Sequence, residues 1–271
     1  MKKFLYITTI LLSVAAIIFG HIHWKNKISN TIVSANDEVS ADENENQAAE
    51  STDNEDTEDE QQQRNIDELT KNLTDEAAAV VKAAVKAGES VEVAVIGSGA
   101  QKMGSNPWPG LVQAGLDEAY GEGVFLIQNH SFGDQFSIHA RVEQRMYDII
   151  EGKPDMVLLE PFLMNDNGDV NPEHSIGSVR ILKRSFEDAN EDIIFMVQPP
   201  HPIYQPTVYG TQVSMLQEYA EENGVTYLDH WENWPDTDDE EIKKYLVELE
   251  GPNDEGNKLW AEYIINYFTG K

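Results

Sequence analysis

Polar residues follow the short apolar runs of this sequence at the points where the runs end. Ser98 comes just after residues 91–96, and His130, His201 and His230 follow three later runs. Hydroxyl and imidazole groups are among those that proteins use for nucleophilic and acid–base catalysis. A serine hydroxyl is a poor nucleophile at neutral pH unless a neighbouring base takes its proton. Any such chemistry therefore depends on the elements that bring these residues together.

Five short apolar runs, rich in aliphatic and β-branched residues, indicate the strands of a parallel sheet. Each run is followed by a loop and a helical pattern, so strand and helix alternate along the chain. Runs this continuous are typical of strands covered on both faces, and the helical intervals supply right-handed crossovers. The expected fold class is α/β, a three-layer α/β/α sandwich with a five-stranded parallel sheet, preceded by a helix from about Asp67 to Ala87. The expected strands are residues 91–96, 124–128, 156–159, 193–197 and 225–228.

The last helix has the clearest helical pattern. Asn253 precedes it as an expected N-cap, and apolar residues recur behind it at helical spacing. They are Leu259, Trp260, Tyr263, Ile264, Tyr267 and Phe268. In an open parallel sheet, ligands bind beyond the carboxyl ends of the strands. The polar residues after each strand are therefore the candidate site residues.

Composition excludes several classes of function. The chain has 271 residues, with 49 acidic and 19 basic side chains, no cysteine and a formal net charge of −30. This charge repels phosphate backbones, so we expect no nucleic-acid partner. Without cysteine there is no disulfide, thiolate zinc site or iron–sulfur cluster. The histidines of the folded region lack metal-ligand spacing, so we expect no metal and no cofactor.

Residues 1–30 are predicted to be an N-terminal membrane anchor or signal segment. A short basic start precedes an uncharged aliphatic stretch from Phe4 to Gly20. Extended to Trp24, the segment approaches the roughly 20 residues that a hydrocarbon core requires. Small residues suited to a signal peptidase lie well downstream. We therefore expect a single-pass helix in a bacterial cell membrane with the domain on the extracytoplasmic side; cleavage would instead give a secreted protein.

Residues 31–63 are predicted to be an acidic, disordered linker between the anchor and a folded domain at residues 64–271. Residues 36–63 contain twelve acids, no base and no aromatic residue. Such a segment cannot bury enough apolar surface to offset chain entropy, and its charges repel one another. The acids also lack the glycine-punctuated spacing of a calcium loop. We therefore expect an extended stalk.

Four blocks, in this order, resemble those of the SGNH (GDSL-type) hydrolases. They are Gly97-Ser98-Gly99, Asn129-x-x-x-Gly133, Pro154-Asp155 with Asn165-Asp166 beyond the strand, and Pro252-Asn253-x-x-Gly256. The likeness covers about Val91 to Phe268. It implies hydrolysis of acyl esters by a serine nucleophile. The implied substrate is an acylated small molecule, or an acylated glycan or lipid of the cell envelope.

The resemblance also implies roles for single residues. Ser98 is the nucleophile, and Gly133 and Asn165 donate hydrogen bonds to the developing oxyanion, which stabilises the tetrahedral intermediate. Two positions depart from the family. Gly99 stands where the family has its serine, so Ser98 serves only if the turn is shifted by one residue. Gly251 stands where the family has its histidine, which makes this chain a divergent relative without the family's base in its last block.

Three imidazoles follow the predicted strands and could supply that base. They are His130, His201 and His230. We prefer His230 because Asp229 adjoins it, although neighbours on an extended chain point in opposite directions. Core or surface packing is the ordinary alternative for each of the three.

Two other functions remain open at this stage. A catalytically silent relative could keep the pocket and bind an envelope polymer or a partner protein. A flavodoxin-like binding domain unrelated to hydrolases would instead place Ser98, Gly133 and Asn165 apart. Ser105 and Ser131 are further hydroxyls, but neither lies at a predicted strand-to-helix turn.

Overall fold

The computed structural model describes residues 63, 65–247 and 251–271. The predicted anchor and nearly all of the predicted acidic linker lie outside the described residues, so both stay predictions. Within the described ranges, no helix combines the length and the apolar character that crossing a membrane requires.

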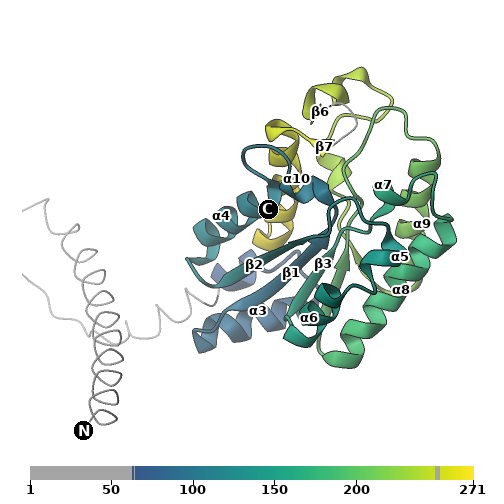
Figure 1. The fold of residues 1–271 in the computed structure, drawn as a ribbon. Helices are drawn as coiled ribbons and strands as arrows, with labels where there is room; N and C mark the ends of the chain where they lie inside the picture. Colours follow the sequence, from purple (N-terminus) through teal and green to yellow (C-terminus); the bar gives the residue numbers. More distant parts are fainter. Residues whose placement is uncertain (1–62, 64, 248–250) are drawn as a thin grey trace, which may run out of the picture. The chain divides into compact units, whose positions relative to one another are not determined.

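Five parallel strands form the central sheet in the order β2-β1-β3-β4-β5 (Figure 1). Every neighbouring pair is parallel, and Val93 lies opposite both Ile127 and Met156. The expected α/β fold is thus confirmed. The strand order reverses between β1 and β3, and ligands bind at such a switch point in open parallel sheets. The strands are β1 (Val91–Gly97), β2 (Phe125–Ser131), β3 (Met156–Leu159), β4 (Ile194–Val197) and β5 (Thr226–Tyr227).

Helices cover both faces of this sheet (Figure 1). One layer consists of α3 (Asp75–Ala87), α4 (Trp108–Tyr120) and α10 (Asp254–Thr269). The opposite layer consists of α5 (Ser137–Ala140), α6 (Gln144–Gly152), α7 (Leu163–Asp166), α8 (Pro172–Ala189) and α9 (Val208–Glu222). The other elements are η1 (Gly99–Lys102), η2 (His230–Asn233), η3 (Glu240–Tyr245), β6 (Leu246–Val247) and β7 (Gly251–Pro252).

Side chains of β1 alternate between two hydrophobic cores, one on either face of the sheet. Val93 and Val95 of β1 pack with the core beneath α3, α4 and α10, whereas Ala94 and Ile96 pack with the core of the opposite layer. Successive side chains of a strand point to opposite faces, so a strand covered on both sides is apolar throughout. This double burial is why the central strands β1 and β3 appear in the sequence as continuous apolar runs.

The N-terminal helix differs from the expectation of one helix from about Asp67 to Ala87. Residues 65–69 are helical, but a turn follows, and α3 begins only at Asp75. Thr74 is the N-cap of α3, with an extended backbone and a side chain that accepts a hydrogen bond from the Ala77 amide at 3.2 Å. A capping residue has non-helical dihedral angles, so the helix cannot run through it.

The last helix agrees with the expectation. The side chain of Asn253 accepts hydrogen bonds from the Glu255 amide at 3.0 Å and the Gly256 amide at 3.1 Å. Trp260, Ile264 and Phe268 are buried in the core below α10. Their spacing places them on one face of the helix, and this face fixes α10 against the sheet.

Candidate active site

The turn that follows β1 is built around two buried side chains. A side chain at Gly97 would overlap Gln101 Nε2 and Glu160 Oε2, so glycine provides the space that both occupy. Ser98 caps η1, and its Oγ accepts a hydrogen bond from the Ala100 amide at 3.3 Å. Ser98 also donates twice to Glu160 Oε2, from its amide at 3.0 Å and from its Oγ at 3.2 Å.

The turns after β1, β2 and β3 lie side by side at this edge of the sheet. The Gly99 amide donates a hydrogen bond to the Gly133 carbonyl at 3.0 Å, and Asn165 Nδ2 donates to the same oxygen at 2.9 Å. Ser131 Oγ donates to the Ser98 carbonyl at 2.8 Å. The structure thus brings Ser98, Gly133 and Asn165 together, which disagrees with the hypothesis that requires them to lie apart.

A cavity of about 440 Å³ opens at these turns. Its wall combines apolar side chains with a hydroxyl, an amide, a carboxylate and an imidazole. The lining residues are Ser98, Gly99, Ala100, Met103, Asp134, Met164, Asn165 and His201. A concave site with a few convergent polar groups at the switch point of a parallel sheet is the usual place for a ligand.

The hydrogen-bond donors suggested by the family resemblance are engaged within the protein. The Gly133 amide donates to Ser131 Oγ at 3.3 Å. Asn165 Nδ2 donates to two carbonyls, those of Gly133 at 2.9 Å and Gln135 at 2.8 Å. Protein oxygens therefore accept the hydrogen bonds that a substrate oxygen would need from these two donors.

His201 is the histidine that lines the Ser98 cavity. It is 1% exposed, and neither ring nitrogen has a hydrogen-bond partner among the described residues. Burial lowers its pKa to about 4, because the charged ring would lose its hydration. The ring is thus neutral at pH 7 and has hydrogen-bonding capacity that no described protein group uses.

His230, the preferred base of the sequence analysis, lies in the core instead. Its Nε2 is 2.9 Å from the Pro199 carbonyl, and its Nδ1 accepts a hydrogen bond from Trp234 Nε1 at 3.1 Å. The ring stacks on Trp260 with the ring centres 4.1 Å apart. It does not line the cavity, and both nitrogens are occupied. This environment gives His230 a packing role and leaves it no nitrogen for Ser98.

His130 belongs to another cavity of the described structure. It lies there beside Arg145 and Asp148, away from the lining that contains Ser98. Burial, and to a smaller degree the charge of Arg145, lowers the pKa of the ring. Of the three sequence candidates, only His201 shares a cavity with Ser98.

Glu160 is the site residue that sequence reasoning missed. It directly follows β3, is 0% exposed, and has one oxygen, Oε1, without a partner among the described residues. Burial raises its pKa to about 8, although the two hydrogen bonds from Ser98 act in the opposite direction. The available signal was a carboxylate at the end of an otherwise apolar strand, where an acidic side chain requires a partner.

Met103 lies against Gly251, the position at which the family resemblance implies a histidine. A side chain at this position would overlap the sulfur of Met103, which itself lines the cavity. The methionine thus fills space that a histidine at 251 would need.

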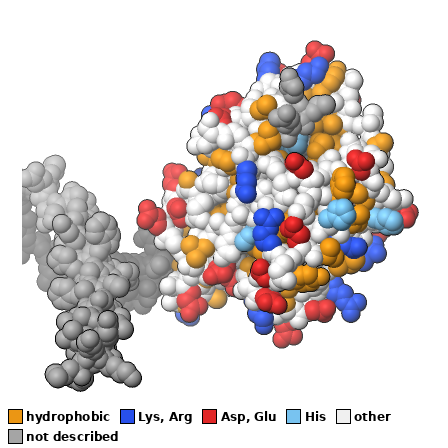
Figure 2. Space-filling view, viewed as in Figure 1, with side chains coloured by type: hydrophobic (Ala, Val, Ile, Leu, Met, Phe, Trp, Pro, Cys, Tyr) orange, Lys and Arg blue, Asp and Glu red, His pale blue; other side chains and the backbone are white. Residues whose placement is uncertain are grey.

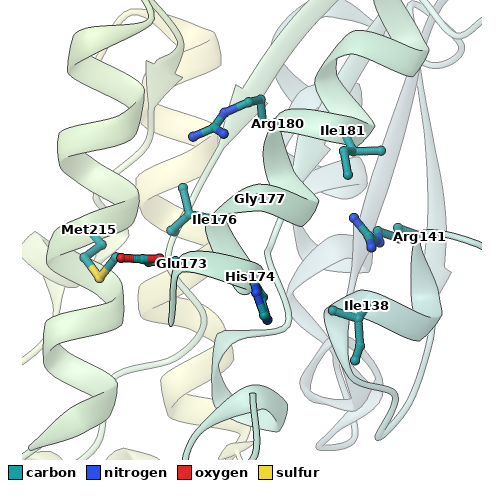
Figure 3. A pocket seen from close by; sticks show the side chains of 9 residues that line it. All are labelled: Ile138, Arg141, Glu173, His174, Ile176, Gly177, Arg180, Ile181 and Met215. Carbon is teal, nitrogen blue, oxygen red and sulfur yellow. The ribbon is translucent and has the colours of Figure 1, made fainter. Parts of the chain in front are cut away.

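A larger cavity, of about 690 Å³, lies between α5, α8 and α9 and shares no lining residue with the first (Figure 3). Arg141, directly after α5, and His174 of α8 both line this cavity (Figure 3). Ile138, Ile176 and Ile181 are the isoleucines of its lining. The lining contains neither a serine nor a buried carboxylate, so it lacks the constellation found at Ser98.

Acidic and basic side chains are interspersed on the face of the molecule that Figure 2 shows.

Comparison with solved structures identifies the fold. A protein assigned to the G-D-S-L family of lipolytic proteins, from Desulfitobacterium hafniense, is 19% identical, with a TM-score of 0.52 over 66% of this chain and 99% of that one. The acetyl xylan esterase AlAXEase is 16% identical, with a TM-score of 0.54 over 64% and 98%. The esterase EstA from Pseudoalteromonas sp. is 15% identical, with a TM-score of 0.53 over 66% and 96%.

These likenesses show that the fold is that of the SGNH (GDSL-type) hydrolases. No protein-family model matches the sequence, and no curated protein matches it. Because one fold can carry many functions, the activity has to be argued from the site itself.

We expect acid to weaken the fold through its buried histidines. The pKa is lowered to about 4 for His201 and to about 3 for His230, so below about pH 6.5 the unfolded chain binds protons that the folded chain does not. The free energy of unfolding therefore falls as the pH falls from about 6.5 to about 4, by up to about 1.4 kcal/mol per pH unit for each histidine. His201→Gln should remove one contribution, measured by urea unfolding at about pH 7 and about pH 5.

The measured quantity is the difference between variant and parent, because Glu160 acts in the opposite direction. Its pKa is raised, so its contribution to the free energy of unfolding falls as the pH rises through the same range. His174→Gln changes an exposed histidine of α8 and should keep the parent's pH dependence. If His201→Gln had the same pH dependence of the free energy of unfolding as the parent, His201 would not be a buried neutral ring.

Proposed function

We propose that this protein is an SGNH-type hydrolase of acyl esters with Ser98 as its nucleophile. The observation that carries the proposal is one cavity, at the switch point of the sheet, whose wall contains Ser98, Asn165 and His201. The fold is shared with esterases, which supports the same reaction class. In this reaction Ser98 Oγ bonds to the acyl carbon, the alcohol leaves, and water releases the acid.

Stabilisation of the oxyanion is assigned to Gly133 and Asn165. For Asn165 to donate to a substrate oxygen, the Gly133 carbonyl must first give up the hydrogen bond that it now accepts. Gly133 has a φ of 63°, a conformation that glycine adopts without strain, so this turn tolerates backbone rearrangement better than one built from other residues. The substrate oxygen then replaces the Gly133 carbonyl oxygen as acceptor. Because this oxygen gains negative charge in the transition state, the hydrogen bond from Asn165 stabilises the transition state more than the bound substrate.

The cavity wall supports a small acyl group as the substrate's reacting end. Ala100, Met103 and Met164 are its apolar members. Methionine side chains adapt to irregular apolar shapes. The unpartnered nitrogens of His201 suit the alcohol portion of the ester, which is rich in hydroxyl groups in a glycan. We therefore propose an acylated small molecule, glycan or lipid as the substrate.

We also propose that residues 4–24 tether the domain to the membrane. The support is the apolar length of this segment and the twelve acids of residues 36–63 that separate it from the domain. The tether places the hydrolase on the extracytoplasmic side, close to acylated polymers of the envelope.

Hydrolysis of 4-nitrophenyl acetate by the purified full chain tests the proposal. The parent should release nitrophenol with saturation kinetics, and Asn165→Ala should lower kcat/KM by about 10²-fold through loss of an oxyanion donor. Asn167→Ala, two residues away and exposed, is the matched control and should retain the parent's rate. Absence of turnover by the parent would reject the hydrolase.

A silent binding protein is the second candidate, and a specific observation favours it. Ser98 Oγ and the Asn165 Nδ2 hydrogens already bond to protein partners, as in a site whose polar groups serve structure. This candidate predicts no turnover but measurable binding of an acetylated xylan oligosaccharide by titration calorimetry. Binding without turnover would establish it in place of the hydrolase.

A further inference from the structure

The family's histidine is absent, yet the hydroxyl of Ser98 already has an acceptor. Its Oγ lies 3.2 Å from Glu160 Oε2, and Glu160 is the side chain to which Ser98 donates in the described structure. We propose that Glu160 is the catalytic base of this site, so that a serine–glutamate pair transfers the proton. This inference rests on the proposed ester hydrolysis and assigns the group that the resemblance leaves open.

The backbone holds Glu160 in place for this role. Oε2 accepts hydrogen bonds from both the amide and the hydroxyl of Ser98, which fixes one carboxylate oxygen against the nucleophile. Gly97 leaves room for the carboxylate beside β1. The residue follows β3 directly, so a strand inside the sheet positions it. A base held by regular structure keeps the short separation that proton transfer requires.

The surroundings of Glu160 give it a suitable basicity. Within the described residues no basic side chain forms an ion pair with it. Burial, and to a smaller degree the charge of Glu160, raises the pKa of Tyr209 of α9 well above its usual value, so Tyr209 stays uncharged. Gln101 lies beside it and has no charge. Burial raises the pKa of Glu160 to about 8, and a base with a pKa near the working pH is an effective proton acceptor.

The carboxylate of Glu160 takes up and returns the proton in both halves of the reaction. As Ser98 Oγ bonds to the acyl carbon, its proton moves to Glu160 Oε2 and the carbonyl electrons move to the oxygen. Collapse breaks the bond to the leaving alcohol, which takes the proton from Glu160. Water then attacks the acyl-serine and gives a proton to Glu160, and Ser98 Oγ recovers that proton as the acid departs. The sum is ester and water to acid and alcohol.

His201 differs from Glu160 in both geometry and pH response. It lines the cavity but makes no hydrogen bond to Ser98 in the described structure. With a pKa of about 4, it does not titrate between about pH 6 and about pH 10. A base with a pKa of about 8 does titrate there, so the pH profile separates the two residues.

The experiment measures two rates between about pH 6 and about pH 10 on the purified full chain. One is hydrolysis of 4-nitrophenyl acetate, and the other is phosphorylation of Ser98 by diethyl 4-nitrophenyl phosphate, followed by mass spectrometry. In the parent both rates should rise with pH to a plateau, with an apparent pKa of about 8. Glu160→Gln should lower both by about 10²-fold and abolish the rise. Glu160→Asp, which keeps a carboxylate, should retain a pH-dependent rise at a reduced rate.

Asp229→Asn is the matched control. Asp229 is another carboxyl near a strand end whose pKa is raised by burial, but unlike Glu160 it accepts no hydrogen bond from Ser98 in the described structure. Its variant should keep the parent's rates and profile. A parent that reacts at Ser98 while Glu160→Gln keeps the parent's rate would overturn the role of Glu160 and leave the hydrolase intact. A reactive parent with a flat profile overturns it as well, even if the variants do not fold. A parent inert to both probes rejects the hydrolase and this inference together.

Discussion

Ser98→Ala should lower kcat/KM for 4-nitrophenyl acetate by at least about 10⁴-fold. The variant has no oxygen to bond to the acyl carbon, and the remaining donors of the cavity can assist only direct attack by water. The change also removes the N-cap of η1 and a donor to Glu160, which should cost about 1 kcal/mol of unfolding free energy. The measurement is steady-state kinetics, with circular dichroism to verify that the variant is folded.

Ser214→Ala provides the control for Ser98→Ala. Ser214 is exposed on α9, and its Oγ donates to the Gly210 carbonyl within the same helix. The same loss of a hydroxyl at this position should leave kcat/KM at the parent's value. Equal rates for the parent and Ser98→Ala, with both folded, would show that Ser98 is not the nucleophile and that its hydroxyl serves only the turn.

Trp260→Ala should lower the free energy of unfolding by about 4 kcal/mol. Trp260 is 0% exposed and stacks between Trp108, at 4.8 Å between ring centres, and His230, at 4.1 Å. Its Nε1 donates to Gln198 Oε1 at 2.9 Å, so the substitution leaves both a cavity and a buried acceptor without its donor. Urea unfolding at constant pH measures the change.

Tyr147→Ala is the comparison for Trp260→Ala. Tyr147 is an aromatic residue of α6 with 46% exposure, so its removal should change the free energy of unfolding by less than about 1 kcal/mol. A loss at Trp260 no larger than that at Tyr147 would mean that the stacked rings do not form the core beneath α10.

The sequence predicted that the site residues meet at one edge of the sheet, because the positions of parallel strands determine where the residues after them lie. Parallel strands end at the same edge, so residues that follow β1, β2 and β3 in the chain become neighbours in space. Ser98, Gly133 and Asn165 lie together for this reason. Their hydrogen-bond partners could not be predicted, because Ser98 donates to Glu160, the Gly133 amide to Ser131 Oγ and Asn165 to the Gly133 carbonyl, and these contacts depend on the conformation of the turns.

The choice among the histidines was decided by packing. His201 and His230 both follow strands in the sequence, yet His201 lines the cavity and His230 stacks on Trp260. The adjacency of Asp229 and His230 suggested a catalytic pair, but the two ring nitrogens of His230 contact the Pro199 carbonyl and Trp234 Nε1 instead. Neighbours in sequence are poor evidence of partners because side chains on an extended segment diverge.

The sequence by itself determined the α/β architecture, the cap of α10 and the edge of the sheet where polar residues gather. The reason is that strands buried on both faces appear as continuous apolar runs, and amphipathic helices appear as apolar residues at helical spacing. Only the tertiary structure decided that Glu160 accepts a hydrogen bond from Ser98, that Met103 fills the space beside Gly251, and that His230 is a packing residue. Those contacts join residues distant in sequence, and their geometry depends on how whole elements pack.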